Sequence, residues 1–339
     1  MSYFKSNIDA MTPYVPGFQP GPEAIKLNAN ENPYPPSPKA WEALAHISDD
    51  ELRVYPDPTG AVFTAAVAET LGVPQSRVLA GNGSDNVLAA VIHAAGGPIA
   101  IPTPTFPYYE TLSQVEGAEI IEVPTDENFR VDFDALAEAN AAVTFLANPN
   151  NPTGVLEPLE AIEALARKLD GLLVVDEAYY DFCGVTALPL VDTCDNVIVT
   201  RTLSKGYSLA SLRMGFAIAQ EPILEALFKA MEIYNVSTTT LLAGARAFVD
   251  QDHKNANAAK ILATREALAA ELTTRGWDVV PSGANFLLAA PPERNAEAVY
   301  ERLKERGIYV RYFKQPRLAD YLRIAVGTDE QTAAVLAAL

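Results

Sequence analysis

Short apolar runs rich in β-branched residues alternate with helix-like stretches from about residue 40 to residue 230. Apolar runs of this kind are typical of strands in a sheet whose two faces are both buried. The pattern predicts strands at residues 98–102, 119–123, 142–146, 172–175 and 197–200. It predicts helices at residues 61–71, 84–93, 132–138 and 158–169. We therefore expect an α/β fold in which helices cover both faces of a mostly parallel central sheet.

The pattern changes after a short predicted helix at residues 222–228, which begins with a proline suited to a first helical turn. A long, alanine-rich helical stretch is then predicted over about residues 241–275. A helix near residues 296–306 follows, among strand-like runs at residues 277–280, 285–288, 308–310 and 322–325. Residues 1–40 are rich in Pro, Asn and Tyr and predict an extended arm with turns. We predict three parts: the arm at residues 1–40, a large domain at 41–240 and a smaller α+β domain at 241–339, which the arm joins.

The charge of the chain limits the class of partner. Among its 339 residues, 25 are Lys or Arg and 43 are Asp or Glu, which gives a formal net charge of −18. A field of this sign repels nucleic acids and anionic membranes. If the ligand carries a phosphate, local groups must bind it, because the overall field opposes binding. We therefore expect small-molecule substrates, and neither a nucleic acid nor a membrane as partner.

Cysteine and histidine usage favours no metal. Cys183 and Cys194 are the two cysteines, without the spacing of a zinc site or a disulfide scaffold, and this predicts a reducing cytoplasm. The three histidines are scattered, in no metal-ligand spacing. The N-terminus lacks the hydrophobic region of a signal peptide. The most apolar stretch, residues 87–101, is too short and too interrupted to span a bilayer.

The first motif with a chemical signature is TLSKGYSLASLR, at residues 202–213. Its lysine, Lys205, follows a predicted strand at the edge where parallel sheets bind ligands. Arg213 can return to the same edge and offer a planar fork to a phosphate, and Thr202 and Ser204 add hydroxyl donors. Alone, Lys205 would be interpreted as a solvated loop residue.

Three more motifs are expected at the same edge. GNGSDN, at residues 81–86, precedes a predicted helix and can form an anion site, although Ser84 or Asp85 can equally be a simple helix cap. NPNNPTG, at residues 148–154, and DEAY, at residues 176–179, each follow a predicted strand. Taken singly, they can be only a turn and a helix cap. Because carboxyl ends of parallel strands meet at one edge, their side chains are expected to converge.

Together, these motifs resemble the pyridoxal 5′-phosphate (PLP)-dependent aminotransferases of class I/II, which have fold type I. The resemblance covers essentially the whole chain, from LNANENP at residues 27–33 to LRIAVG at residues 322–327. The segments SKGYSLASLRMGF and NPNNPTG are highly specific for this superfamily. TPY at residues 12–14 and LNANENP point to its histidinol-phosphate branch.

The resemblance implies roles for the residues around the cofactor ring. Lys205 forms a Schiff base with PLP and later carries a proton, while Asp176 keeps the ring nitrogen protonated. Holding that proton about 3 pKa units above its free value takes roughly 4 kcal/mol, which a buried carboxylate can supply. Asn151 and Tyr179 hydrogen-bond the phenolic oxygen of the ring. Tyr109 stacks on the ring face, with Tyr108 as the less favoured candidate.

The resemblance also implies a phosphate site and a shared dimer. Gly83, Ser84, Asp85, Ser204 and Arg213 hold the cofactor phosphate, with Thr202 beside them. Tyr55 reaches the same phosphate from the neighbouring subunit, which implies a homodimer.

At the substrate end, Arg323 matches the arginine that binds a carboxylate, a bidentate pair that contributes about 1.5–3 kcal/mol. Arg311 and Tyr14 match positions that bind the phosphate of histidinol phosphate, and Asn30 and Asn151 lie near the substrate. The chain departs from the family pattern at Gly206-Tyr207, where a small residue and Phe are common.

The implied reaction transfers an amino group between glutamate and imidazole acetol phosphate in histidine biosynthesis. The departure at Gly206-Tyr207 keeps an aromatic amino-acid aminotransferase open as the alternative, with threonine-phosphate decarboxylase behind it. A non-catalytic module on this fold would be expected to lack Lys205 or Asp176, and both are present. A nucleotide enzyme built on GNGSDN would need a Gly-Lys-Ser/Thr phosphate loop, which the sequence lacks.

Overall fold

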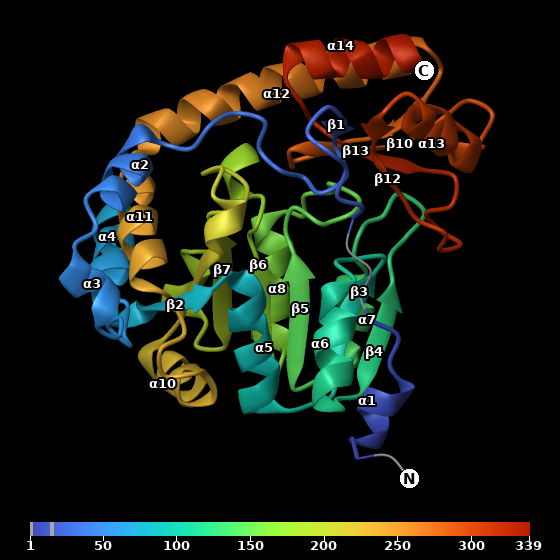
Figure 1. Cartoon of the computed structure of the whole chain (residues 1–339). Helices are drawn as coiled ribbons and strands as arrows, with labels where there is room; N and C mark the ends of the chain where they lie inside the picture. The colour runs from blue at the N-terminus through green and yellow to red at the C-terminus, as the bar shows by residue number, and fades with distance from the viewer. Residues whose placement is uncertain (1–2, 14–16) are drawn as a thin grey trace.

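A seven-stranded sheet forms the centre of the larger part of the molecule (Figure 1). The structure is a computed structural model that describes residues 3–13 and 17–339. The strand order is β2-β8-β7-β6-β5-β3-β4, and β8 runs antiparallel to both of its neighbours while the other pairs are parallel. The strands are β2 (Val78–Asn82), β3 (Ile99–Thr103), β4 (Ile120–Pro124), β5 (Val143–Ala147), β6 (Leu172–Asp176), β7 (Val197–Thr202) and β8 (Met214–Ile218).

The expected mostly parallel α/β sheet is confirmed, and each of the five predicted strands lies within two residues of a strand of the structure. The strands β2 and β8 were not predicted. Their sequences, VLAGN and MGFAI, both contain glycine, which is depleted in strands. Both segments also adjoin motifs that the sequence assigned to ligand binding.

Helices cover both faces of this sheet because successive strand residues point to opposite sides. In β5, Phe145 belongs to the hydrophobic cluster under α5 and α6, while Leu146 belongs to the cluster on the other face, which includes Ile162 of α8. The helices of this part are α2 (Pro38–Ala45), α3 (Asp49–Arg53), α4 (Ala61–Leu71), α5 (Ser84–Ala95), α6 (Tyr108–Glu116), α7 (Phe133–Glu138), α8 (Leu159–Lys168), α9 (Leu190–Thr193), α10 (Glu221–Ala230) and α11 (Thr238–Phe248).

A smaller antiparallel sheet of order β12-β13-β10-β9 forms a second core. Its strands and helices are β9 (Asp278–Val280), β10 (Phe286–Ala290), β12 (Arg311–Tyr312), β13 (Leu322–Ala325), α12 (Gln251–Thr274), α13 (Ala296–Glu305) and α14 (Asp329–Ala338). From the N-terminal arm, which also contains α1 (Ser6–Ala10), β1 (Ile25–Lys26) pairs in parallel with β11 (Ile308–Tyr309). At β1 the arm thus lies against the smaller part, while at α1 the Asn7 amide donates to the carbonyl oxygen of Gln114 in α6 at 2.8 Å. The domain boundaries drawn from the sequence stay a prediction.

The long stretch predicted over residues 241–275 is helical almost throughout, but it is interrupted once. The structure has two helices, α11 and α12, which are separated at Val249 and Asp250. The Asp250 carboxylate accepts hydrogen bonds from the Ser37 hydroxyl and the Lys39 ammonium, so the interruption lies against the start of α2. The alanine-rich pattern carries no sign of this long-range contact. As Figure 1 shows, α12 then runs from beside α2 and α11 to the smaller part.

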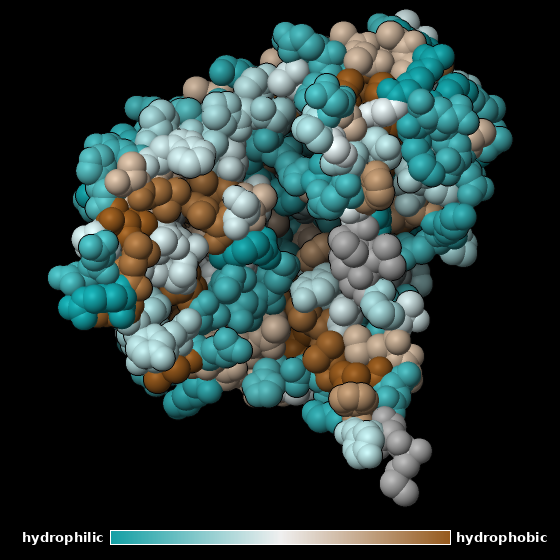
Figure 2. Space-filling model, in the orientation of Figure 1, coloured by the Kyte–Doolittle hydropathy of each residue, from teal (hydrophilic) through white to brown (hydrophobic). Residues whose placement is uncertain are grey.

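Large hydrophobic side chains are exposed around α2, α3 and α4. We call this surface the α2–α4 patch, and its members are Trp41, Leu52, Val54, Tyr55, Val62, Ile233 and Tyr234. Tyr55 is 77% exposed and stacks on Tyr234 with ring centroids 4.3 Å apart. Figure 2 shows hydrophobic side chains gathered on this side of the molecule. Within the described residues, no helix is both long enough and apolar enough to cross a membrane.

Candidate active site

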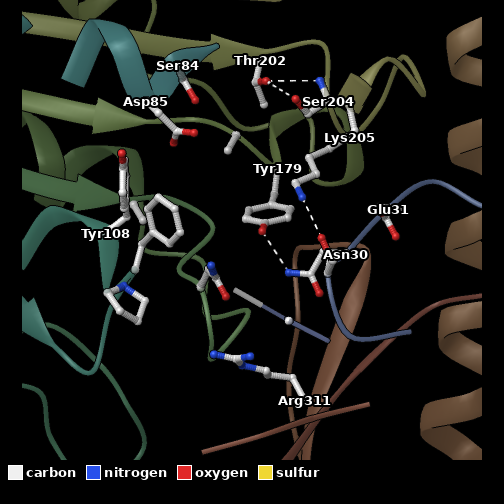
Figure 3. A pocket seen from close by; sticks show the side chains of 18 of the residues that line it. Asn30, Glu31, Ser84, Asp85, Tyr108, Tyr179, Thr202, Ser204, Lys205 and Arg311 are labelled. Atoms are coloured by element: carbon white, nitrogen blue, oxygen red, sulfur yellow. Dashed lines mark hydrogen bonds between the residues drawn. The ribbon is translucent and has the colours of Figure 1, made fainter. Parts of the chain in front are cut away.

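A cavity of about 490 Å³ lies at the carboxyl ends of β5, β6 and β7, between the large sheet, the arm and the smaller sheet. Each strand contributes its last residue to the wall: Ala147, Asp176 and Thr202. The arm contributes residues 28–31. Figure 3 shows Ser84, Thr202 and Ser204 at one end of this cavity, Arg311 at the other, and Lys205 with Tyr179 between them.

Lys205 lies three residues after the end of β7 and extends into the cavity (Figure 3). Its ammonium nitrogen, Nζ, donates a hydrogen bond to the carbonyl oxygen of Ala29 at 2.9 Å. From the arm, the Asn32 amide donates to the carbonyl oxygen of Lys205 at 3.1 Å and fixes the loop. Burial, assisted by the positive charge of Arg323, lowers the pKa of Lys205 from 10.5 to about 8. At pH 7 about a tenth of the amine is therefore neutral, and the neutral amine is the nucleophilic form.

Asp176 ends β6 and lines the same cavity, although its side chain is almost fully buried. Its Oδ2 accepts a hydrogen bond from the Tyr109 hydroxyl at 2.7 Å, and its Oδ1 accepts from the Thr200 hydroxyl and the Ala178 backbone N–H, each at 3.2 Å. Burial raises the pKa of Asp176 from 3.8 to about 6, while these hydrogen bonds oppose the rise. The carboxylate is thus mainly ionised at neutral pH.

An anion cradle forms where α5 begins. No side chain caps this helix at Gly83, whose φ is 77°. Its first backbone N–H groups therefore remain available to donate hydrogen bonds to an anion. The Arg213 guanidinium donates to the Ser204 hydroxyl at 3.5 Å and to the Asp85 carboxylate at 2.8 Å. A Cβ on Gly83 would lie 2.6 Å from Nη2 of Arg213, so only glycine leaves room for this approach. Behind the cradle, the Thr202 hydroxyl donates to Ser204 at 3.0 Å.

The arginines of the smaller sheet meet by strand pairing. Arg311 of β12 and Arg323 of β13 are direct partners in the antiparallel register, and both line the cavity. Side chains at directly opposite positions lie on the same face of a sheet. Arg323 donates to the Asn151 side-chain oxygen at 2.5 Å and to the carbonyl oxygen of Asn28 at 2.7 Å. The structure therefore gathers two guanidinium groups where the sequence showed two separate motifs.

Residues 22–339 match the family model of aminotransferases of class I and II. The chain belongs to this family.

Relatives in this family share nearly the full length of the chain. The histidinol-phosphate aminotransferase 1 of Trichormus variabilis is 48% identical, over 100% of this chain and 98% of the relative. The histidinol-phosphate aminotransferase of Pseudomonas putida strain W619 is 44% identical, over 97% of each chain. The crystal structure of histidinol-phosphate aminotransferase from Sinorhizobium meliloti in complex with pyridoxal-5′-phosphate matches with a TM-score of 0.91 and 28% identity. It covers 100% of this chain and 97% of that one.

Aminotransferases of this family depend on PLP, and the cavity fits that cofactor. A partly neutral amine suits its aldehyde, a buried carboxylate suits its ring nitrogen, and an uncapped helix N-terminus beside an arginine suits its phosphate. Tyr179 accepts a hydrogen bond from the Asn30 amide at 2.9 Å. The buried oxygen of that amide has no hydrogen-bond partner among the described residues, so the wall keeps a free acceptor.

Most of the predicted site residues of this aminotransferase share the cavity. They are Asn30, Ser84, Asp85, Asn151, Asp176, Tyr179, Thr202, Ser204, Lys205, Arg213, Arg311 and Arg323. Gly83 lies behind the wall, as the residue that precedes α5. Tyr55 lies in the exposed α2–α4 patch instead, so its role at a neighbouring site stays a prediction. Tyr14 falls outside the described residues.

Tyr109 requires a correction. Its side chain is 0% exposed and does not belong to the cavity wall, because its ring is packed beneath the surface against Phe145. The neighbouring residues Phe106 and Tyr108 line the cavity instead. We propose that these two aromatic side chains, in place of Tyr109, stack on the cofactor ring.

The sequence analysis also missed Phe313 and the Ala29 carbonyl. Phe313 lies two residues after Arg311, so strand alternation could have placed both on one face. The Ala29 carbonyl oxygen accepts a hydrogen bond from the Lys205 side chain. The two residues are 176 positions apart, and the sequence gives no signal for this contact.

Proposed function

We propose that this chain transfers an amino group between glutamate and imidazole acetol phosphate, giving histidinol phosphate and 2-oxoglutarate in histidine biosynthesis, with PLP on Lys205. One observation carries the proposal: a single cavity joins the Lys205 amine and the Asp176 carboxylate to a cross-strand pair of arginines. The relatives from Trichormus variabilis and Pseudomonas putida, at 48% and 44% identity over nearly the whole chain, support the same substrate.

The cofactor end supplies a nucleophile, a carboxylate and an anion cradle. Lys205 binds the aldehyde through its neutral amine, and once released by a substrate it moves a proton at the substrate carbon. Asp176 holds a proton on the ring nitrogen. When bound, PLP withdraws electrons from the carbon that bears the amino group. The cradle of Ser84, Ser204 and Arg213 orients the cofactor through its phosphate.

The substrate end must accept two different anions. Glutamate brings an α-carboxylate, which we assign to Arg323, and histidinol phosphate brings a phosphate, which we assign to Arg311. Both are planar guanidinium groups that bind such oxygens in a bidentate way. Because the net charge of −18 opposes anion binding, these local charges decide affinity.

We further propose a homodimer in which Tyr55 reaches the cradle of its partner. The α2–α4 patch exposes Trp41, Leu52 and Tyr55 by 63–77%, an apolar surface of the kind that protein interfaces cover. The side chains of Arg213 and Asp85 are 45% and 37% exposed, so the cradle has an open side. For the location of the protein we propose the cytoplasm, as the sparse cysteines predict.

A half-reaction panel tests this substrate assignment. The purified holoenzyme is mixed in single turnover with histidinol phosphate, glutamate, phenylalanine or tyrosine. The loss of absorbance of the Lys205-bound cofactor is followed over time. We expect histidinol phosphate and glutamate to react fastest. Faster reaction with phenylalanine or tyrosine than with histidinol phosphate would favour the aromatic alternative, which the apolar walls at Phe106, Tyr108 and Phe313 could accept.

A further inference from the structure

Tyr109 contacts the Asp176 carboxylate from behind the cavity wall. It lies in the first turn of α6, is 0% exposed, and donates its hydroxyl hydrogen to Oδ2 of Asp176 at 2.7 Å. Asp176 lines the cavity and Tyr109 does not. The hydroxyl therefore touches the catalytic carboxylate without reaching the ligand.

Rigid packing fixes the position of this hydroxyl. The Tyr109 ring stacks on Phe145 of β5, with centroids 4.9 Å apart and an interplanar angle of 14°. On another side, Phe106 packs edge-on, with centroids 5.5 Å apart at 85°. A ring held between two aromatic neighbours and a sheet has little freedom, so the direction of the O–H group is set by the fold.

Asp176 has hydrogen-bond acceptor sites beyond those that its neighbours in the fold occupy. Its Oδ1 accepts from Thr200 and from the Ala178 N–H, and a carboxylate offers about four acceptor sites in all. Tyr109 thus occupies one site on Oδ2 and leaves further lone pairs for a donor in the cavity. Without Tyr109, Oδ2 would lose the only donor that reaches it from the described residues.

We propose that Tyr109 is a positioning residue that keeps Asp176 ionised and oriented, so that the shared proton stays on the cofactor's ring nitrogen. This inference rests on the proposed function, because it needs PLP in the cavity. A single proton is divided between the ring nitrogen and the carboxylate, and no bond to carbon changes. Donation by Tyr109 makes the carboxylate a weaker base, and the proton then resides on nitrogen.

The surrounding charges agree with this direction. Burial raises the pKa of Asp176 most strongly, the Tyr109 hydrogen bond lowers it, and the negative charge of Asp85 on α5 raises it again. Thr200 on β7 and the Ala178 N–H lower it further. Burial and the Asp176 charge raise the pKa of Tyr109 well above 10.0, so its hydroxyl keeps its proton and remains a donor at neutral pH.

The variant Tyr109→Phe tests the proposal, because it removes one oxygen and keeps the stacked ring. We would load wild type and variant with PLP carrying ¹⁵N at the ring nitrogen and measure its NMR shift across pH. A hydrogen bond to a charged group corresponds to roughly one pKa unit or more, about a tenfold change in the proton's distribution. We expect the variant's nitrogen shift to move toward the unprotonated value, with kcat about tenfold lower and KM for histidinol phosphate little changed.

A matched control is Tyr207→Phe. Tyr207 is also buried and stacks on Phe248 at 5.3 Å, and its hydroxyl oxygen accepts a hydrogen bond from the Gln251 amide at 2.9 Å. This variant removes the same atom without touching Asp176, and its nitrogen shift should equal that of wild type. An unchanged shift in Tyr109→Phe, or an equal shift in both variants, would overturn the inference. A wild type without a borohydride-trapped Lys205 adduct would instead overturn the proposed function, so the two failures are distinguishable.

Discussion

The two ends of the cavity are built in different ways. The cofactor end comes from the carboxyl ends of neighbouring strands and from α5, so short motifs supply Asp176, Ser204 and Lys205 within one sheet. The substrate end comes from the arm and from β12 and β13. The arm lies almost 300 positions before these strands in the chain, and Arg323, for example, donates to the carbonyl oxygen of Asn28. The cofactor end is therefore carried by short motifs at the edge of one sheet, whereas the substrate end exists only where the arm meets the smaller sheet.

This difference predicts different consequences of mutation. The groups at the cofactor end act on every substrate, because each half-reaction passes through the same cofactor. In the proposed function the arginines at the substrate end bind particular anions, so their loss should change which substrate is used. The following predictions order these effects from the largest to the smallest.

The largest effect is expected for Lys205→Ala. Turnover should fall by at least about 10³-fold, because the variant lacks the covalent attachment and the proton carrier. The borohydride-trapped adduct should disappear, as measured by mass spectrometry. The control is Lys168→Ala, which removes an exposed lysine of α8 and should keep the adduct. An adduct that persists in Lys205→Ala would refute the assignment of the nucleophile.

Asp176→Ala should retain the cofactor weakly and lower turnover by about 10³-fold, the rate equivalent of the roughly 4 kcal/mol needed to keep the ring protonated. The loss should be similar for glutamate and histidinol phosphate, since both depend on the ring nitrogen. Steady-state kinetics with both substrates measure it. Asp195→Ala, at an exposed carboxylate, is the control. Near-normal turnover in Asp176→Ala would remove its electronic role.

Arg311→Ala should separate the two substrates. We expect kcat/KM for histidinol phosphate to fall by about 10- to 100-fold, as for loss of a charged hydrogen bond, while the glutamate half-reaction changes far less. The control is Lys314→Ala, which removes a neighbouring exposed charge paired with Glu297. Equal losses for both substrates would mean that the substrate end does not discriminate anions as proposed.

The smallest effect is the pH dependence of cofactor capture. With its pKa lowered to about 8 by burial and by Arg323, the Lys205 amine should be mostly neutral above pH 8 and mostly protonated below it. Because the neutral amine reacts, capture of PLP by the apoenzyme should rise with pH and level off above about 9, with the rate at pH 7 about tenfold below the plateau. Stopped-flow absorbance measures this rate. A rate still rising tenfold per unit above pH 9 would indicate an ordinary lysine.

The sequence by itself determined the cofactor end. Strand periodicity placed residues 172–175 and 197–200 in one parallel sheet, and side chains just after parallel strands must meet at one edge. Asp176 and Lys205 could be placed together for this reason, without knowledge of the tertiary structure.

Only the tertiary structure decided the rest. Tyr108 and Tyr109 are adjacent on α6, but each helical residue is rotated by about 100° from the last, so the packing of the helix decides which one faces the cavity. The pairing of Arg311 with Arg323 depends on a strand register that no short motif encodes. The contact of Lys205 with Ala29 depends on where the arm returns. Short sequence motifs identify the reactive residues. Strand register, the rotation of a helix about its axis and the path of the arm instead depend on how the whole chain buries its apolar surface.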